Sequence, residues 1–188
     1  MKRNLFKDTM KVLNIHEREL EASFSKVGEL IDSLASQRDR LWPIRSWPRM
    51  EFDRPLEIGA RGGHGPIHYF VEDYTQGESI RFCFTGPKGF DGFHEFDIVT
   101  ALDKPVVLRH TLKMNTHGLA ILSWPLVIGP MHDALIEDAF ATAQYSLGLT
   151  VKIQPWSPWV KILRWIFSGG KPRPQLPPGH QFKTDMQA

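Results

Sequence analysis

Three histidines occupy positions at which an imidazole could act on a bound molecule. In the run GFHEFDIV, His94 shares one side of an expected strand with Phe96 and Ile98, because successive strand side chains point to opposite faces. His110 lies among apolar residues on one side of the run PVVLRHTLKM, and His132 falls near the middle of the apolar arc of an expected helix. Imidazole titrates near neutral pH, exchanges hydrogen bonds and binds metal ions. The three positions therefore predict polar groups inside an otherwise apolar cavity.

Three roles for these histidines are open. They could bind zinc or iron, exchange protons with a carbonyl or hydroxyl group of a ligand, or serve as half-buried structural groups. A metal site is not expected, because no H-x-x-x-H or H-E-x-x-H spacing supports one, and no cofactor is predicted. We expect at least one of the three histidines to contact a polar group of a ligand. We interpret His16, His68, His117 and His180 as surface or turn residues.

Two glycine-containing loops could border the cavity. The run from 59 to 65 lacks both the G-x-x-x-x-G-K-[ST] and the G-x-G-x-x-G spacing of phosphate-binding loops, and it leads into an expected strand. We interpret it as a tight turn or bulge, with Arg61 and His64 at its tip, where they could cover the mouth of the cavity. A hairpin loop further along carries Phe90 and Phe93, which we expect to act as a lid or simply to pack.

Nucleophilic catalysis has little support in the sequence. Cys83 alternates with apolar neighbours and so faces away from them, and no base is assigned beside it. Ser123 is not part of a G-x-S-x-G turn, and no pair of carboxylates falls in the expected cavity. Catalytic residues are therefore unassigned, and an enzyme would have to depend on histidines, on a tyrosine such as Tyr69 and on water.

Composition and charge indicate one ordinary domain with a basic tail. The 188 residues are 41% hydrophobic and 23% charged, which is enough to bury a core. After residue 150 the chain carries six Lys or Arg and one Asp, which leaves the first 150 residues mildly acidic and argues against a nucleic-acid-binding face. The single cysteine excludes an internal disulfide and suits a reducing compartment. Because the first residues lack an apolar run typical of a signal peptide, we expect a cytoplasmic protein.

The elements that position these residues follow from the hydrophobic pattern. The segment 12–21 predicts a strand with one wet face, and Ser23 predicts the start of a short helix. A tryptophan-packed loop follows, and then six runs with strand character. These six runs are 56–60, 66–74, 79–86, 92–99, 105–114 and 118–124. A helix over 131–147, ended by Gly148, completes the expected order, with seven antiparallel strands in all.

The basic tail predicts a second amphipathic helix. Residues 156–167 contain three tryptophans, and Lys161 and Arg164 lie opposite a broad apolar arc. The arc of the expected helix is formed by Trp156, Trp159, Val160, Leu163, Ile166 and Phe167. Gly169 and Gly170 are expected to end it, and the proline-rich remainder is expected to be extended and disordered. One hypothesis is peripheral contact of 156–167 with the inner face of a membrane, and the other is packing on the domain or on a partner subunit in a homodimer.

The order of elements, together with the strings GARGGHGPIHYFVEDY, RFCFTGPKGFDGFHEF, LRHTL, SWPL and MHDALIEDA, resembles an uncharacterised bacterial branch of the START-like, or SRPBCC, superfamily. The resemblance covers about residues 10 to 147 and extends to polyketide cyclase-like and Bet v 1-like proteins. It implies an α+β helix-grip fold, in which a seven-stranded curved antiparallel sheet surrounds a long C-terminal helix. The chain is then expected to consist of a ligand-binding domain, residues 1–150, and an additional tail, residues 151–188.

The resemblance implies a cavity for an apolar ligand, and strand and helix faces indicate its walls. The residues expected to bind ligand are His94, His110, His132, Phe82, Phe84, Phe96, Ile98, Leu108, Leu112, Met114, Leu135 and Ala139. The preferred hypothesis is binding of a hydrophobic small molecule, such as a lipid, a fatty acid or a polyketide-like aromatic, without catalysis. The alternatives are a cyclase or dehydratase that uses cavity histidines as acid–base groups, and a membrane-recruitment or interaction module.

Overall fold

Seven strands form one antiparallel sheet in the computed structural model, which describes residues 9–102, 104–172 and 174–178. The strands are β1 (Thr9–Leu20), β2 (Glu51–Phe52), β3 (Arg61–His64), β4 (Ile67–Thr75), β5 (Ser79–Gly86), β6 (Phe90–Val99) and β7 (Val106–His117). Their order across the sheet is β1-β7-β6-β5-β4-β3-β2, so β2 to β7 form a meander and β1 pairs with β7.

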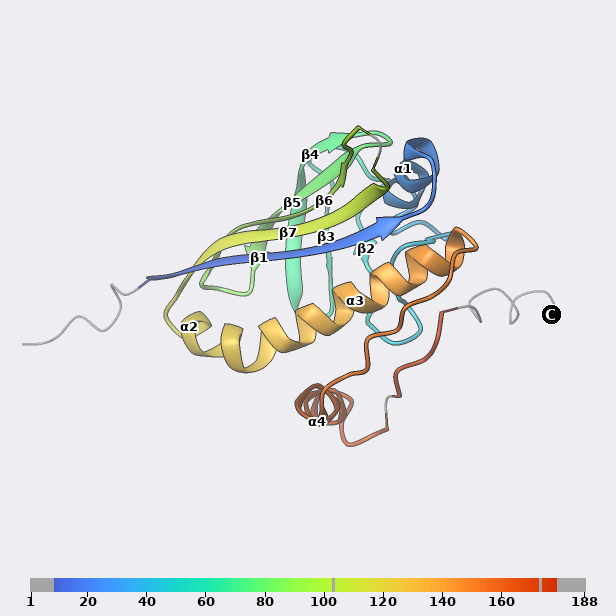
Figure 1. Ribbon diagram of the computed structural model, residues 1–188. Coiled ribbons are helices and arrows are strands. Elements are labelled where there is room, and N and C mark those ends of the chain that lie inside the picture. The colour runs from blue at the N-terminus through green and yellow to red at the C-terminus, as the bar shows by residue number, and fades with distance from the viewer. Residues whose placement is uncertain (1–8, 103, 173, 179–188) are drawn as a thin grey trace, which may run out of the picture.

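The helices comprise α1 (Phe24–Asp32), α2 (Ala120–Ser123), a π-helical turn η1 (Trp124–Ile128), α3 (Gly129–Ser146) and α4 (Pro158–Phe167). Because α2, η1 and α3 follow one another directly, they form one long helical unit that crosses the concave side of the sheet (Figure 1). The expected helix-grip arrangement is confirmed, including the additional helix α4. The long helix begins earlier than the expected residue 131.

The number of strands is confirmed, but two of the expected strands are wrong. Residues 56–60 form turns, and 118–124 enter helix α2 and the π-helical turn. A short apolar run such as 118–124 has the same pattern in a strand and in a buried helix, so periodicity could not distinguish them. The missing strands are β2 and β3, where a Cβ at Gly62 would lie 2.0 Å from the carbonyl oxygen of Glu51. Glycine permits this close pairing, although it is depleted in strands generally.

Helix α1 and the loop after it fill one end of the sheet. Ser23 caps the helix as expected, because its side chain accepts a hydrogen bond from the Lys26 backbone N–H. The helix contacts β5, β6 and β7 and buries Val27 and Ile31. In the following loop the Trp42 side chain is buried and donates from Nε1 to the Pro48 carbonyl oxygen, 2.8 Å away. The expectation of a tryptophan-packed loop is confirmed.

The tail docks on the body of the domain. Trp156, Val160 and Leu163 are buried, and Ser157 caps α4 by accepting from the Val160 backbone N–H at 3.2 Å. Beyond α4, the Leu176 backbone N–H donates to the Ser46 hydroxyl at 3.1 Å. Residues 174–178 therefore contact the domain, contrary to the expected disorder of the whole proline-rich end. Residues 179–188 lie outside the described part of the chain.

One carboxylate holds the tail in place. Asp138 Oδ2 on α3 accepts from Trp47 Nε1 at 2.8 Å and from Trp156 Nε1 at 2.9 Å, while Asp138 Oδ1 accepts from Gln175 Nε2 at 2.6 Å. The guanidinium of Arg164 stacks on the Trp47 ring, 4.4 Å from its centroid. Three separate segments of the chain thus meet at this acidic side chain.

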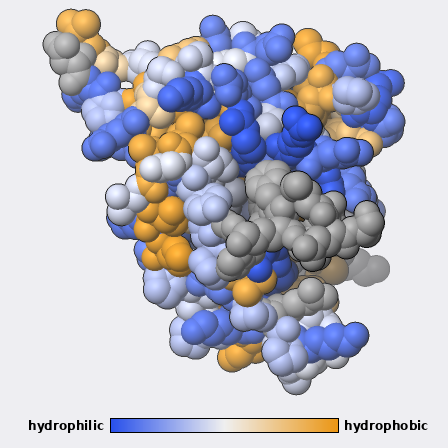
Figure 2. Space-filling view, turned by 90° about the vertical axis from the view of Figure 1, so that its right-hand side faces the viewer, coloured by the Kyte–Doolittle hydropathy of each residue, from blue (hydrophilic) through white to orange (hydrophobic). Residues whose placement is uncertain are grey.

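The surface is mixed in character. On the face seen in Figure 2, hydrophobic side chains are visible as separate patches among hydrophilic ones. No helix in the described residues is long and apolar enough to cross a membrane.

Candidate functional site

A cavity of about 300 Å³ lies between the sheet and the long helix. Strands β5, β6 and β7 contribute one wall, and η1 and α3 contribute the opposite one. The loop around Trp42 and Trp47, the turn between β3 and β4, and the end of α4 complete the enclosure. Most lining side chains are aliphatic or aromatic, and the exceptions are Arg164 and four histidines, His64, His94, His110 and His132. Such an apolar cavity with a few polar groups is the usual form of a small-molecule site.

The structure places half of the expected site residues on the cavity wall. These are His94, His110, His132, Phe84, Leu112 and Leu135. The other six lie elsewhere. Phe82, Phe96, Leu108 and Ala139 are fully buried in the main core, Ile98 packs against that core, and Met114 belongs to a second apolar cluster with Phe90 and Trp124.

The expected residues are split between cavity wall and core for a simple geometric reason. Strand alternation indicates which face a side chain occupies but not its distance along the strand. On β7, Leu112 and His110 line the cavity, whereas Leu108 lies nearer the end at which α1 fills the space against the sheet. The cavity therefore occupies only the middle of the inward face, and the flanking inward residues belong to the core.

The three expected histidines converge. His94 Nδ1 lies 3.3 Å from His110 Nε2, and the ring centroids of His110 and His132 are 5.0 Å apart. His94 and His110 come from the neighbouring strands β6 and β7, which are paired antiparallel, and His132 reaches them from α3. Sheet and helix thus bring residues distant in sequence to one side of the cavity.

Burial keeps these imidazoles neutral. Desolvation lowers the pKa of His94 and of His110 well below the usual value, and neighbouring histidines lower both further. Burial also lowers the pKa of His132, against the opposing effect of Asp133. His94 Nε2, His110 Nδ1 and His132 Nε2 are buried without a hydrogen-bond partner. A buried nitrogen of this kind costs free energy unless something bonds to it, so these atoms suit a ligand hydroxyl or carbonyl.

His64 borders the cavity, as the sequence suggested, but it does so from a strand. It was expected at the tip of a turn, but it is the last residue of β3 and lines the cavity beside Trp42. Its Nδ1 lies 3.0 Å from the Tyr69 hydroxyl, and burial lowers its pKa to about 3. The Tyr69 ring in turn packs edge-on against His94, with centroids 4.7 Å apart. The glycines around His64 concealed the strand that positions it.

Of the remaining expectations, the one for His16 is wrong. Phe90 lines the cavity, but Phe93 faces the other side of the sheet, where Arg81 stacks on its ring at 4.4 Å. His68 and His117 are exposed, as expected, and His180 lies outside the described residues. His16 is not a surface residue: its side chain is only 16% exposed and lies between β1 and α3.

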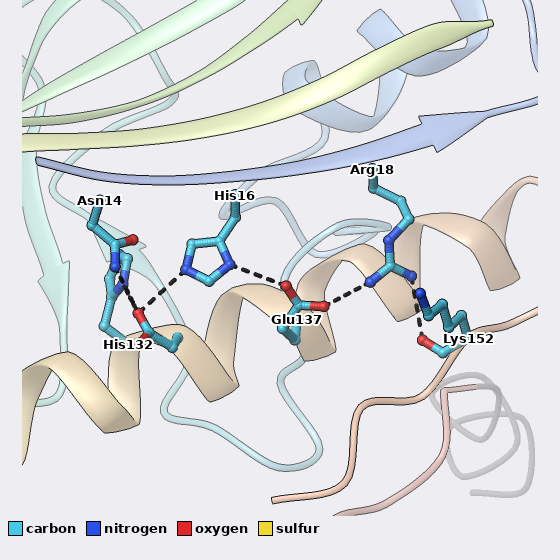
Figure 3. A network of polar contacts seen from close by, with 7 residues as sticks. Asn14, His16, Arg18, His132, Glu137 and Lys152 are labelled. Carbon is cyan, nitrogen blue, oxygen red and sulfur yellow. Dashed lines mark hydrogen bonds and ion pairs between the residues drawn. The ribbon is translucent and has the colours of Figure 1, made fainter.

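A polar network surrounds His16 (Figure 3). Its Nδ1 lies 3.0 Å from Glu137 Oε1, its Nε2 lies 3.2 Å from Asp133 Oδ1, and these carboxylates raise its pKa to about 9 despite partial burial. Arg18 Nη2 donates to Glu137 Oε2 at 2.7 Å. The inward face of β1 therefore joins the sheet to α3 through polar contacts.

Comparison with known proteins supports the fold. No protein-family model matches the chain, and no curated protein matches it in sequence. A solution NMR structure from Thermobifida fusca superposes with a TM-score of 0.56 at 14% identity and covers 76% of this chain and 97% of its own. A point mutant of norcoclaurine synthase from Thalictrum flavum, in complex with a transition-state analogue, gives 0.54 at 15% identity and covers 75% and 97%. The chain therefore has the same helix-grip fold as these solved structures.

A further helix-grip protein matches over more of the chain. CalU16 from Micromonospora echinospora has a TM-score of 0.50 at 11% identity and covers 87% of this chain and 98% of its own. At such identities the agreement concerns the fold alone. Function must therefore be argued from the cavity itself.

Proposed function

We propose that this helix-grip protein binds a hydrophobic small molecule that carries an uncharged hydroxyl or carbonyl group. The observation that carries the proposal is the apolar cavity with three unpartnered, neutral imidazole nitrogens on one side. Apolar walls favour the ligand through burial of its surface, and the nitrogens orient it through hydrogen bonds.

The size and chemistry of the cavity narrow the ligand class. A volume of about 300 Å³ is at the lower end of the range for small-molecule sites, so it suits a compact molecule better than a two-chain lipid. Rings from Trp42, Phe84, Phe90 and Trp124 line it. Among the candidates, a polyketide-like aromatic therefore fits better than a phospholipid, and a fatty acid fits only with its carboxyl group at the histidines.

Mass spectrometry of protein purified under gentle conditions tests the binding function. We expect one apolar molecule per chain, released on denaturation. The double variant H94Q/H110Q should retain less of it, because the polar contacts change, while H68Q, at an exposed histidine, should retain as much as the wild type. Ligand-free protein that also fails to take up small hydroxylated aromatics would contradict the proposal.

The short distance between His94 and His110 supports an enzymatic function as the alternative. His94 and His110 are 3.3 Å apart, which is within the direct reach that proton transfer requires. A cyclase or dehydratase could use this pair to move a proton while the walls hold the substrate folded. The test is incubation of the identified ligand with wild-type protein and with H94Q. Conversion by the wild type alone supports the enzyme, and an unchanged ligand supports binding without reaction.

The outward face of α4 favours a peripheral membrane partner. Trp159, Ile162, Trp165 and Ile166 are exposed there, although the opposite face of the helix is docked. Tryptophans with basic neighbours such as Lys161 are typical of helices that lie in a membrane interface. The proposal places a cytoplasmic protein at the inner membrane face.

Vesicle sedimentation tests this contact without disturbing the fold. The variant I162E/I166E should lose binding to anionic vesicles, whereas L13E/I15E, at exposed positions of β1, should bind like the wild type. A homodimer through α4 is the competing partner. Light scattering would reveal it as a dimer that I162E/I166E converts to a monomer, with no vesicle binding by either protein.

A further inference from the structure

Three potential ligand atoms for a metal ion meet between β1 and α3, at the edge of the cavity that His132 lines. One donor atom each from His16, His132 and Asp133 lies within 4.8 Å of the others, and this is the only such group among the described residues. Asp133 Oδ1 is 3.2 Å from His16 Nε2 and 3.4 Å from His132 Nδ1. Ligand atoms bonded to one ion at about 2.1 Å are separated by similar distances, so the spacing suits an ion at the centre.

Hydrogen bonding alone accounts poorly for this arrangement. Asp133 Oδ1 is approached by three nitrogens, because Asn14 Nδ2 also lies 2.9 Å away (Figure 3). A carboxylate has about four lone-pair sites on its two oxygens, so a single oxygen has roughly two for these three donors. Meanwhile Asn14 Oδ1 is buried without a partner. Exchange of the amide oxygen and nitrogen of Asn14 would turn a fourth oxygen ligand toward the same centre.

The surroundings of His16 match those of a metal-binding histidine. Its second nitrogen, Nδ1, lies 3.0 Å from Glu137 Oε1, and Arg18 anchors that carboxylate at 2.7 Å. A carboxylate on the far nitrogen of a histidine orients the ring and raises its basicity toward a metal. Two imidazoles and a carboxylate are the ligand types preferred by Zn²⁺ and Fe²⁺ in sites that keep an open position.

We infer that β1 and α3 hold a divalent transition-metal ion, with His16 Nε2, His132 Nδ1 and Asp133 Oδ1 as its ligands. Asn14 supplies a fourth oxygen, and Glu137 orients His16. The site also bears on the cavity, because His132 lines it. A metal on Nδ1 leaves the proton of this imidazole on Nε2, so His132 becomes a hydrogen-bond donor to the ligand. The metal site itself does not depend on the proposed ligand.

Calorimetry with Zn²⁺ alone tests the inference. Full-length protein without an affinity tag is stripped with a chelator and titrated. The expected result is one Zn²⁺ per chain. H16Q and D133N should each weaken binding by at least about tenfold, and E137Q by about 10- to 100-fold, the range for partners that orient a metal ligand. Co²⁺ should give a visible absorption spectrum in the wild type that H16Q removes.

Matched controls separate the site from other binding. H68Q and H117Q remove exposed histidines and should leave the affinity unchanged. N14D adds a carboxylate at the fourth ligand position, so it should strengthen Zn²⁺ binding, which keeps the inference testable if H16Q fails to fold. The inference is overturned if the wild type binds no Zn²⁺, if binding disappears in H68Q or H117Q instead, or if N14D leaves the affinity unchanged.

Discussion

Mild acid should destabilise this protein through its buried histidines. His94 and His110 are buried and His64 is half-buried, and desolvation of the ring is the main reason that each has a lowered pKa. A group whose pKa is lower in the folded state binds more protons when the chain is unfolded. The free energy of unfolding therefore falls as the pH drops below about 6.5, the ordinary pKa of histidine.

The magnitude follows from proton linkage. The pKa of His64 is lowered to about 3, so its ring is not protonated in the folded protein at pH 5.5, and burial lowers the pKa of His94 and of His110 in the same direction. Between pH 7.5 and 5.5 His64 should lower the free energy of unfolding by about 1 kcal/mol, and His94 and His110 should add to this loss. The raised pKa of His16, about 9, acts in the opposite direction and reduces the net change.

Urea unfolding at both pH values, with a chelator present, isolates the contribution of one histidine. In H94Q and in H110Q the loss of stability between pH 7.5 and 5.5 should be smaller than in the wild type, because one group that takes up a proton on unfolding is gone. H68Q should lose as much as the wild type, because this histidine is exposed. Equal losses in H94Q, H110Q and the wild type would refute the reasoning, since the imidazoles would then not be held neutral by the fold.

Three further changes test other parts of the structure. Replacement of Asp138 by Leu should lower the free energy of unfolding by roughly 3 kcal/mol, because two buried indole N–H groups lose their acceptor. L112W should fill the cavity and abolish ligand uptake in the mass-spectrometric assay. S23A should cost about 1 kcal/mol in urea unfolding, by removing the cap of α1. A stable D138L variant, a ligand-loaded L112W variant or an unchanged S23A variant would contradict these expectations.

The sequence predicted the parts of this fold that depend on repeated patterns. Alternation along β6 and β7 predicted correctly that His94 and His110 point inward, and the cap at Ser23 located the start of α1. Patterns of this kind arise from local geometry, which each segment carries by itself. The element order indicated the helix-grip arrangement only together with the resemblance to a known superfamily, since two of the expected strands were wrong.

The rest depended on contacts between distant segments. Phe96 and Leu108 share the inward face with the cavity histidines, but only the packing of α1 determines that they belong to the core. His16 appeared to be a surface residue because β1 alternates polar and apolar residues. In the structure the polar side chains face α3, while Leu13 and Ile15 are exposed. Such a reversal has no local signal.

The docking of the tail has a consequence for ligand exchange. Arg164 and Phe167 of α4 line the cavity, although α4 is not part of the sheet or of the long helix. The tail is held by a few buried side chains and by the bonds to Asp138, so its detachment costs less free energy than global unfolding. Amide hydrogen exchange in α4 should therefore be faster than in β6 and β7. A bound ligand should slow it, because the same local opening that exposes these amides also opens the route by which the ligand leaves.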